Sequence, residues 1–256
     1  MTTFIDLTHS ISLATTPLII YPGDPSLLIT PHATIPKDGY AVHTIQMGTH
    51  TGTHIDSPAH FVEGGRTIDE VPLDQLIGRA LVVDLASAPI KLLKRQKIEW
   101  EDLESAWRST SSDSNLGDEL GNGNYAILLV NTGWSKIHSP NSAEDVPAFF
   151  AHPYFSSSIA QRLLSSHPNI QIFGSDTPNP DETPYDGVGG ASGYAFHDIF
   201  LGGDRLIVEN LANLDQLAAA ATQTAQGDWI VNVVPLKIEG VDGSPVRAFA
   251  YKNRTV

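Results

Sequence analysis

Residues 47–61 read MGTHTGTHIDSPAHF and concentrate potential metal ligands in one short stretch. His50, His54, Asp56 and His60 all fall within a window of eleven residues. An even spread of the chain's ten histidines would place about 0.4 in such a window, and this one holds three. Imidazole and carboxylate groups are ligands of zinc, manganese and iron(II). The spacing therefore predicts a metal site.

The composition of this stretch opposes a helix. Zinc proteases also use a His-x-x-x-His pair, but they carry it on a helix and place a glutamate after the first histidine. Here Thr51, Gly52 and Thr53 separate the two histidines, and glycine and β-branched residues disfavour a helix. We therefore expect an irregular loop that leaves a strand. In extended backbone, His54 and Asp56 would point the same way because they are two residues apart.

The ligand types favour an open catalytic site over a structural one. A lone histidine more often packs than binds a metal, but a cluster of this density reverses that preference. Structural zinc usually has four closed protein ligands, often thiolates. The chain has no cysteine, so thiolate sites, disulfides and thiol nucleophiles are excluded.

Composition limits the partners and the location. The 256 residues include 15 basic and 29 acidic side chains, which give a formal net charge of −14. Such a chain repels nucleic acids and anionic membranes, so neither is an expected partner. No lysine or arginine precedes Lys37, and no apolar run approaches membrane-spanning length. We expect a soluble cytoplasmic protein.

Apolar runs and periodicity predict a mixture of strands and helices. Strands are expected at 4–9, 41–47, 80–85, 126–130, 170–173, 205–208, 229–238 and 246–251, and helices at 98–108, 156–166 and 213–222. Residues 109–124 are polar and rich in glycine, serine and asparagine, which predicts a mobile surface insertion. Ligand candidates lie on both sides of this segment, so residues 1–256 are predicted to form a single domain.

The histidine-rich stretch also resembles the signature His-x-Gly-Thr-His-x-Asp-x-Pro-x-His of the cyclase-like metal-dependent hydrolases, a family that includes kynurenine formamidases and isatin hydrolases. Weaker similarities to this family extend along nearly the whole chain. They comprise Asp6–His9, Tyr21–Asp24, Asn131–Trp134, Gly174–Thr177, His197 followed by Glu209–Leu211, and Pro235–Lys237 with Gly243–Arg247.

The resemblance implies an α/β fold with a mixed β-barrel-like sheet flanked by helices, and a homo-oligomer, either a dimer or a tetramer. It implies that one or two divalent metal ions, zinc or manganese, bind the chain. His50, His54 and Asp56 would hold the main ion, and His60, His197 and Glu209 would complete the site. With two ions, Asp56 and Glu209 would contact both; with one ion, His60 or His197 would be available for proton transfer.

The resemblance also implies metal-assisted hydrolysis of an amide, formamide or lactam, with a small aromatic compound as the expected substrate. A bound metal activates water near neutral pH. The candidates for general acid and base are His60, His197 and Glu209.

Two alternatives stay open at this stage. In the first, His54, Asp56 and His197 form the facial triad of an iron(II) oxygenase, and Arg205 holds a 2-oxoacid. In the second, the chain is a catalytically silent metal-binding member of the family. Among aromatic residues, Phe149, Phe150 and Tyr154 are expected to pack in the interior rather than to line a pocket. The loop 179–190 is expected to lie over the site.

Overall fold

The structure is a computed structural model of the protein. It describes residues 2–12, 20–88, 92–110, 114–137, 145–184, 193–223 and 228–252. Their main element is a nine-stranded sheet in the order β1-β13-β11-β5-β7-β9-β10-β4-β12. The strands are β1 (Thr3–Asp6), β4 (His54–Asp56), β5 (Ile77–Asp84), β7 (Ile127–Asn131), β9 (Ile172–Ser175), β10 (Leu206–Glu209), β11 (Trp229–Asn232), β12 (Gly243–Pro245) and β13 (Phe249–Lys252).

The sheet has a parallel centre and antiparallel flanks. Strands β5, β7, β9 and β10 run parallel, and the pairs on either side of them are antiparallel. The apolar runs of β5 and β7 are almost wholly buried because both faces of the sheet are covered. This mixed, curled sheet with flanking helices confirms the predicted fold class.

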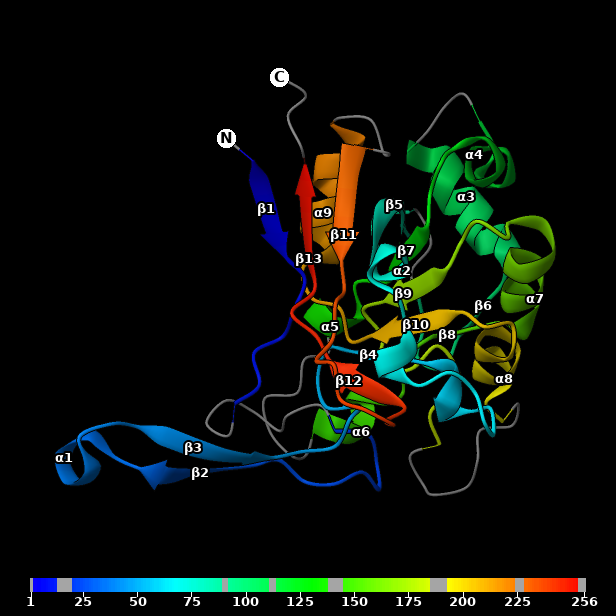
Figure 1. The fold of residues 1–256 in the computed structure, drawn as a ribbon. Helices are drawn as coiled ribbons and strands as arrows, with labels where there is room; N and C mark the ends of the chain where they lie inside the picture. Colours follow the sequence, from blue (N-terminus) through cyan, green and yellow to red (C-terminus); the bar gives the residue numbers. More distant parts are fainter. Residues whose placement is uncertain are drawn as a thin grey trace.

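Helices cover the two faces unequally (Figure 1). One face packs with α3 (Trp100–Thr110), α4 (Leu116–Asn122), α7 (Ser157–Ser166) and α8 (Ala195–Gly202), and the other with α9 (Leu214–Thr222). The shorter elements are α1 (Ile35–Asp38), α2 (Leu73–Leu76), α5 (Trp134–Ile137), α6 (Val146–Phe149), the 3-10 turns η1 (Pro58–His60) and η2 (Ile68–Glu70), and the paired strands β6 (Lys97–Ile98) and β8 (Tyr154–Phe155).

The predicted mobile insertion is largely packed structure. Within 109–124, residues 116–122 form α4, and Leu116 and Leu120 are fully buried against α3. Asn115 caps this helix by accepting a hydrogen bond from the Asp118 amide at 2.8 Å. Two leucines four residues apart lie on the same side of this short helix, so both can pack against α3. Residues 111–113 lie outside the described residues.

Two strand boundaries also differ from the prediction. The expected strand 229–238 ends at Asn232, whose side chain accepts a hydrogen bond from the Val234 amide, and Pro235 then has no amide hydrogen for a ladder. In the histidine-rich stretch, residues 54–56 form β4 rather than a loop because β10 and β12 pair with it on both sides.

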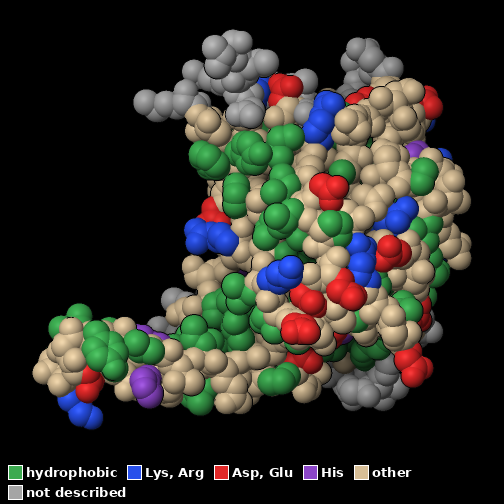
Figure 2. All heavy atoms as spheres, viewed as in Figure 1, with side chains coloured by type: hydrophobic (Ala, Val, Ile, Leu, Met, Phe, Trp, Pro, Cys, Tyr) green, Lys and Arg blue, Asp and Glu red, His purple; other side chains and the backbone are tan. Residues whose placement is uncertain are grey.

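Residues 27–46 form an arm that projects from the body of the molecule (Figures 1 and 2). Its strands β2 (Leu28–Ala33) and β3 (Val42–Gln46) make a separate two-stranded sheet, and α1 lies at its tip. Every residue of β3 is exposed, and α1 buries none.

None of the helices within the described ranges has the length and apolar character needed to cross a membrane. A cytoplasmic location stays a prediction.

The packing of α4 can be tested by Leu120→Ala. Deleting a fully buried leucine side chain costs about 2–5 kcal/mol, so we expect a clear drop in the free energy of unfolding measured with urea. Leu93→Ala is the control because Leu93 is 62% exposed, and its effect should stay within about 0.5 kcal/mol. Equal effects of the two substitutions would contradict the packing described for α4.

Candidate metal centre

The pairing of β4 with β10 brings three candidate ligands onto one face of the sheet. In the antiparallel register Glu209 lies directly opposite His54, and Ile207 lies opposite Asp56. Residues that face each other across a ladder point to the same side, as do alternate residues of one strand. His54, Asp56 and Glu209 are all buried there, so the predicted common direction of His54 and Asp56 is confirmed.

His197 reaches the same point from the first turn of α8. Its Nε2 lies 3.2 Å from a Glu209 carboxylate oxygen and 3.6 Å from Asp56 Oδ2. The Nε2 of His54 lies 3.3 Å from Asp56 and 3.3 Å from Glu209. Two imidazoles and two carboxylates therefore converge in the interior.

The second nitrogen of each of these rings is held by an oxygen outside the cluster. His54 Nδ1 is 2.8 Å from the Gly52 carbonyl oxygen, and His197 Nδ1 is 2.7 Å from Asp181 Oδ2. A carbonyl oxygen can only accept, so His54 Nδ1 carries a hydrogen and Nε2 is the nitrogen that faces the cluster. The Asp181 carboxylate also accepts the backbone amides of Phe196 and His197, which fixes the start of α8.

His50 and His60 form the outer part of the site. Their rings stack with centroids 3.9 Å apart and planes inclined by 29°. His50 Nδ1 lies 2.7 Å from Asp56 Oδ1, which joins this pair to the buried cluster. All six predicted ligands are thus brought together, although they come from four secondary-structure elements and one loop.

Sequence reasoning missed two carboxylates that support the histidines, Asp181 and Asp242. Asp242 accepts hydrogen bonds from His50 Nε2 at 2.9 Å and His60 Nδ1 at 3.1 Å. It lies in a glycine-rich connector, where an acidic residue is ordinarily a solvated turn residue. The next residue, Gly243, shows how closely this turn approaches His50. A Cβ on Gly243 would lie 2.8 Å from His50 Cε1, so this position accepts no larger side chain without movement.

The clustered charges shift one another's pKa values. Burial lowers the pKa of His54 and His197, but the nearby carboxylates outweigh burial and hold both pKa values well above the ordinary value. Burial raises the pKa of Asp56, but the imidazoles of His54 and His50 outweigh it and hold this pKa well below its usual range. Protons on the imidazoles therefore neutralise the carboxylates, and a cation that binds here must displace them.

The residues present fit a divalent metal. Asp56 Oδ2 is buried and has no hydrogen-bond partner among the described residues, which is costly unless a cation occupies the space beside it. Ligand atoms of His54, Asp56 and Glu209 lie within 4.8 Å of one another, as do those of His50, Asp56 and His60. Nitrogen and carboxylate donors without thiolates suit zinc, manganese and iron(II).

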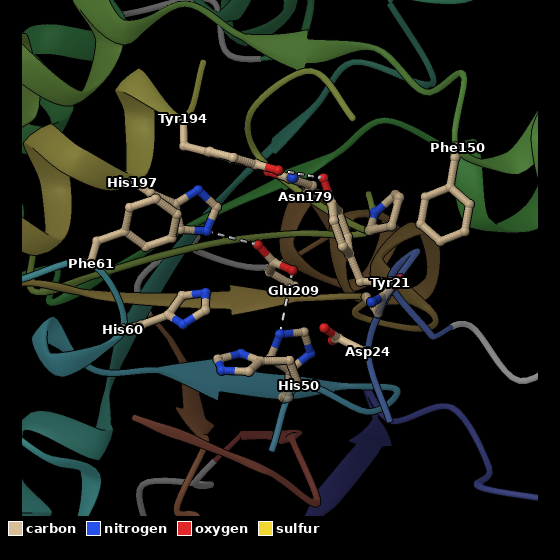
Figure 3. A pocket seen from close by; sticks show the side chains of 13 residues that line it. Tyr21, Asp24, His50, His60, Phe61, Phe150, Asn179, Tyr194, His197 and Glu209 are labelled. Carbon is tan, nitrogen blue, oxygen red and sulfur yellow. Dashed lines mark hydrogen bonds and ion pairs between the residues drawn. The ribbon is translucent and has the colours of Figure 1, made fainter. Parts of the chain in front are cut away.

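A cavity of about 260 Å³ opens beside this cluster (Figure 3). Four aromatic side chains line it: Tyr21, Phe61, Phe150 and Tyr194. The Tyr21 and Tyr194 hydroxyls lie 3.1 Å apart, and the Phe61 ring stacks on His197 at 4.6 Å. Asp24, Asn179 and Asn210 add polar groups to the wall.

Other sequence-based expectations meet mixed outcomes. Phe149 packs in the interior with Trp134, as expected, whereas Phe150 also lines the cavity. The role that the oxygenase alternative gave to Arg205 is not supported, because its guanidinium donates to the backbone carbonyls of Pro168, Gly203 and Asp204 and does not line the cavity. In the loop 179–190, Asn179 lines the cavity, and residues 185–190 lie outside the described residues.

A family model described as "Putative cyclase" matches residues 5–182 of the chain, which include the histidine-rich stretch. The chain belongs to the cyclase family. The resemblance drawn from the sequence motifs is thereby confirmed.

Curated relatives of this cyclase-family protein extend the match along the chain. It is 28% identical to a kynurenine formamidase of Salinibacter ruber over 250 residues, which cover 95% of each chain. It is 30% identical to a kynurenine formamidase of Bacillus cereus over 207 residues, covering 81% of this chain and 78% of the relative.

Solved structures share the fold. An isatin hydrolase A from Ralstonia solanacearum superposes with a TM-score of 0.73 at 25% identity, covering 98% of this chain and 92% of that one. An isatin hydrolase A from Labrenzia aggregata gives a TM-score of 0.73 at 24% identity, covering 99% and 94%.

Removing a ligand at the centre of the cluster should remove the metal. We expect His54→Ala and Asp56→Ala to abolish both bound metal and turnover, because these side chains contribute donors at the point where the ligands converge. Elemental analysis of purified protein measures the first effect. His43→Ala is the matched control, since His43 is exposed on the arm. Full metal content in either cluster variant would contradict this assignment.

Proposed function

We propose that the protein is a metal-dependent hydrolase that cleaves the carbon–nitrogen bond of a small amide, formamide or lactam. The observation that carries this proposal is the convergence of four imidazoles and two carboxylates beside an aromatic cavity. Membership of the cyclase family and the kynurenine formamidase relatives support it.

We infer that the metal ligands are drawn from His50, His54, Asp56, His60, His197 and Glu209, with one or two zinc or manganese ions as the cofactor. When bound, such an ion supplies Lewis acidity that lowers the pKa of water and polarises a carbonyl. The chain contributes donors whose orientations are already fixed. The Gly52 carbonyl, Asp181 and Asp242 hold the far nitrogens of the rings, so little rearrangement is needed on binding.

Proton transfer is assigned to His60, His197 or Glu209. The imidazoles of His197 and His54 counter the effects of burial and of Asp56, so the pKa of Glu209 lies below its ordinary value and its carboxylate is ionised at neutral pH. It can therefore accept a proton from water. His60 lines the cavity with one ring nitrogen bound to Asp242, so its other nitrogen is available to take a proton from water and pass it to a leaving nitrogen.

The cavity walls favour a small aromatic substrate. Its volume of about 260 Å³ lies just below the range of about 300–1,000 Å³ typical of small-molecule sites, so a small substrate is expected. Phe61, Phe150 and the two tyrosines offer ring faces and edges for stacking. One solved relative is described as an isatin hydrolase bound to the product analogue thioisatinate.

Hydrolysis of N-formylkynurenine and isatin by the zinc- or manganese-loaded protein tests this function. We expect turnover of at least one compound, and a loss of about 10²- to 10⁴-fold in kcat for His60→Ala if this residue transfers the proton. Metal content measured on the same sample separates that role from ligation, because a ligand variant also loses metal. Bound metal without turnover of any amide, lactam or lactone would favour the catalytically silent alternative.

We also propose that the chain forms a closed homo-oligomer, a dimer or a tetramer, through its arm. A two-stranded hairpin is marginally stable in water without further packing. The arm exposes apolar side chains along its length: Leu28, Ile35, Tyr40, Val42 and Ile45. The register places Leu28 and Val42 on one face of the hairpin and Ile45 on the other, so both faces need cover.

Charge favours a second copy of the chain as the partner. Lys37 and Asp38 are the only lysine, arginine, aspartate or glutamate residues in 27–46, so the arm has no formal net charge in a chain of −14. It can therefore approach another copy without the repulsion that two acidic surfaces would suffer. The arm begins and ends near the cavity residues Asp24 and His50, so self-association would also steady the site entrance.

A charge introduced on the arm should dissociate the oligomer. We expect Ile45→Asp to shift the mass measured by light scattering to that of the monomer, because a buried unpaired carboxylate opposes association. Leu93→Asp is the control, since Leu93 lies outside the arm and is 62% exposed against 58% for Ile45. A wild-type monomer, or an unchanged mass for Ile45→Asp, would argue against the arm as the interface.

A further inference from the structure

Asp242 lies on the turn that precedes β12 and is fastened to the histidine-rich stretch by its backbone. Its carbonyl oxygen accepts hydrogen bonds from both the amide and the hydroxyl of Ser57, each at 2.9 Å. The neighbouring Gly243 lies directly opposite Asp56 in the ladder between β12 and β4. The position of the Asp242 backbone therefore follows from the sheet and does not require its side chain.

The Asp242 carboxylate is directed at two candidate ligands together. Its Oδ2 accepts from His50 Nε2 at 2.9 Å and from His60 Nδ1 at 3.1 Å, while Oδ1 accepts from the Thr49 hydroxyl at 3.0 Å. The two rings stack because their edges meet the same oxygen. One carboxylate thus sets the rotation of both imidazoles, and the Thr49 hydroxyl fixes the rotation of the carboxylate itself.

These contacts also select the ring nitrogens that remain available. A nitrogen that donates to a carboxylate carries its hydrogen, so the opposite nitrogen is left to bind a metal or to accept a proton. For His50 the nitrogen opposite Asp242 is Nδ1, which lies 2.7 Å from Asp56 Oδ1 at the edge of the buried cluster, so a metal that binds there displaces the proton held between the two groups. For His60 it is Nε2, on a ring that lines the cavity.

We propose that Asp242 is a positioning residue for this site, which orients His50 for metal binding and His60 for proton transfer through a single carboxylate. The part that concerns His60 rests on the proposed hydrolase function; the part that concerns His50 requires only metal binding. Carboxylates that orient ligand histidines typically change metal affinity about 10- to 100-fold when they are removed.

The first test compares metal affinity in Asp242→Asn and Glu239→Gln, measured for zinc and manganese by competition with a chelator. Both substitutions remove one negative charge from the same connector, but Glu239 is exposed. We expect about 10- to 100-fold weaker binding for Asp242→Asn and no change for Glu239→Gln. Equal affinities in the two variants would overturn the role assigned through His50. If Asp242→Asn does not fold, Asp242→Glu carries the same comparison, with an intermediate loss expected.

The second test asks whether Asp242 acts through His60. At saturating metal, Asp242→Asn should lower kcat at least about tenfold, with a smaller change in KM, in the otherwise wild-type enzyme. In a His60→Ala background the same substitution should change kcat by less than about twofold, because the group it positions is gone. Equal losses in both backgrounds would show a general structural role and overturn the proposal for His60.

The two tests separate this proposal from the proposed function. A wild-type protein that binds metal but hydrolyses no amide leaves the affinity comparison to decide the role of Asp242 at His50, and removes the role at His60. A wild-type protein that binds no metal would overturn the proposed function and this proposal together.

Discussion

The antiparallel pairing of β4 between β10 and β12 is the constraint on which the site depends. It places Glu209 opposite His54 and Gly243 opposite Asp56, so ligands separated by more than 150 residues share one face of the sheet. A shift of this register by one residue would turn His54 and Asp56 to the other side. The pairing of this short strand with both neighbours therefore matters more for the geometry of the site than any single ligand does.

Electrostatics then explains why the cluster has this composition. Two carboxylates buried side by side repel each other and lose their hydration, which costs several kcal/mol for each ion unless cations are close. The imidazoles provide those cations as imidazolium groups, and a divalent metal can replace them. The buried Asp56 Oδ2 without a hydrogen-bond partner among the described residues shows that the protein alone does not fully satisfy this arrangement. Polar groups that a fold leaves unsatisfied are expected where a ligand completes the site.

The cavity brings together segments with no relation in the sequence. Tyr21 precedes the arm, Phe61 follows the histidine-rich stretch, Phe150 follows α6, and Tyr194 immediately precedes α8. The aromatic walls of the cavity therefore come from connecting segments rather than from the central strands.

The sequence by itself determined the candidate metal-binding stretch, the buried strands β5 and β7, and the amphipathic helix α3, because each depends on short-range spacing. It also suggested His197 and Glu209 as candidate ligands, but through family resemblance rather than local pattern. It did not reveal that α4 is packed, because the two leucines of this polar segment are buried only through their contact with α3. Asp181, Asp242 and the aromatic walls were decided by tertiary structure alone. They lie on turns and loops whose proximity to the histidines arises from sheet pairing, and no local periodicity records such long-range contacts.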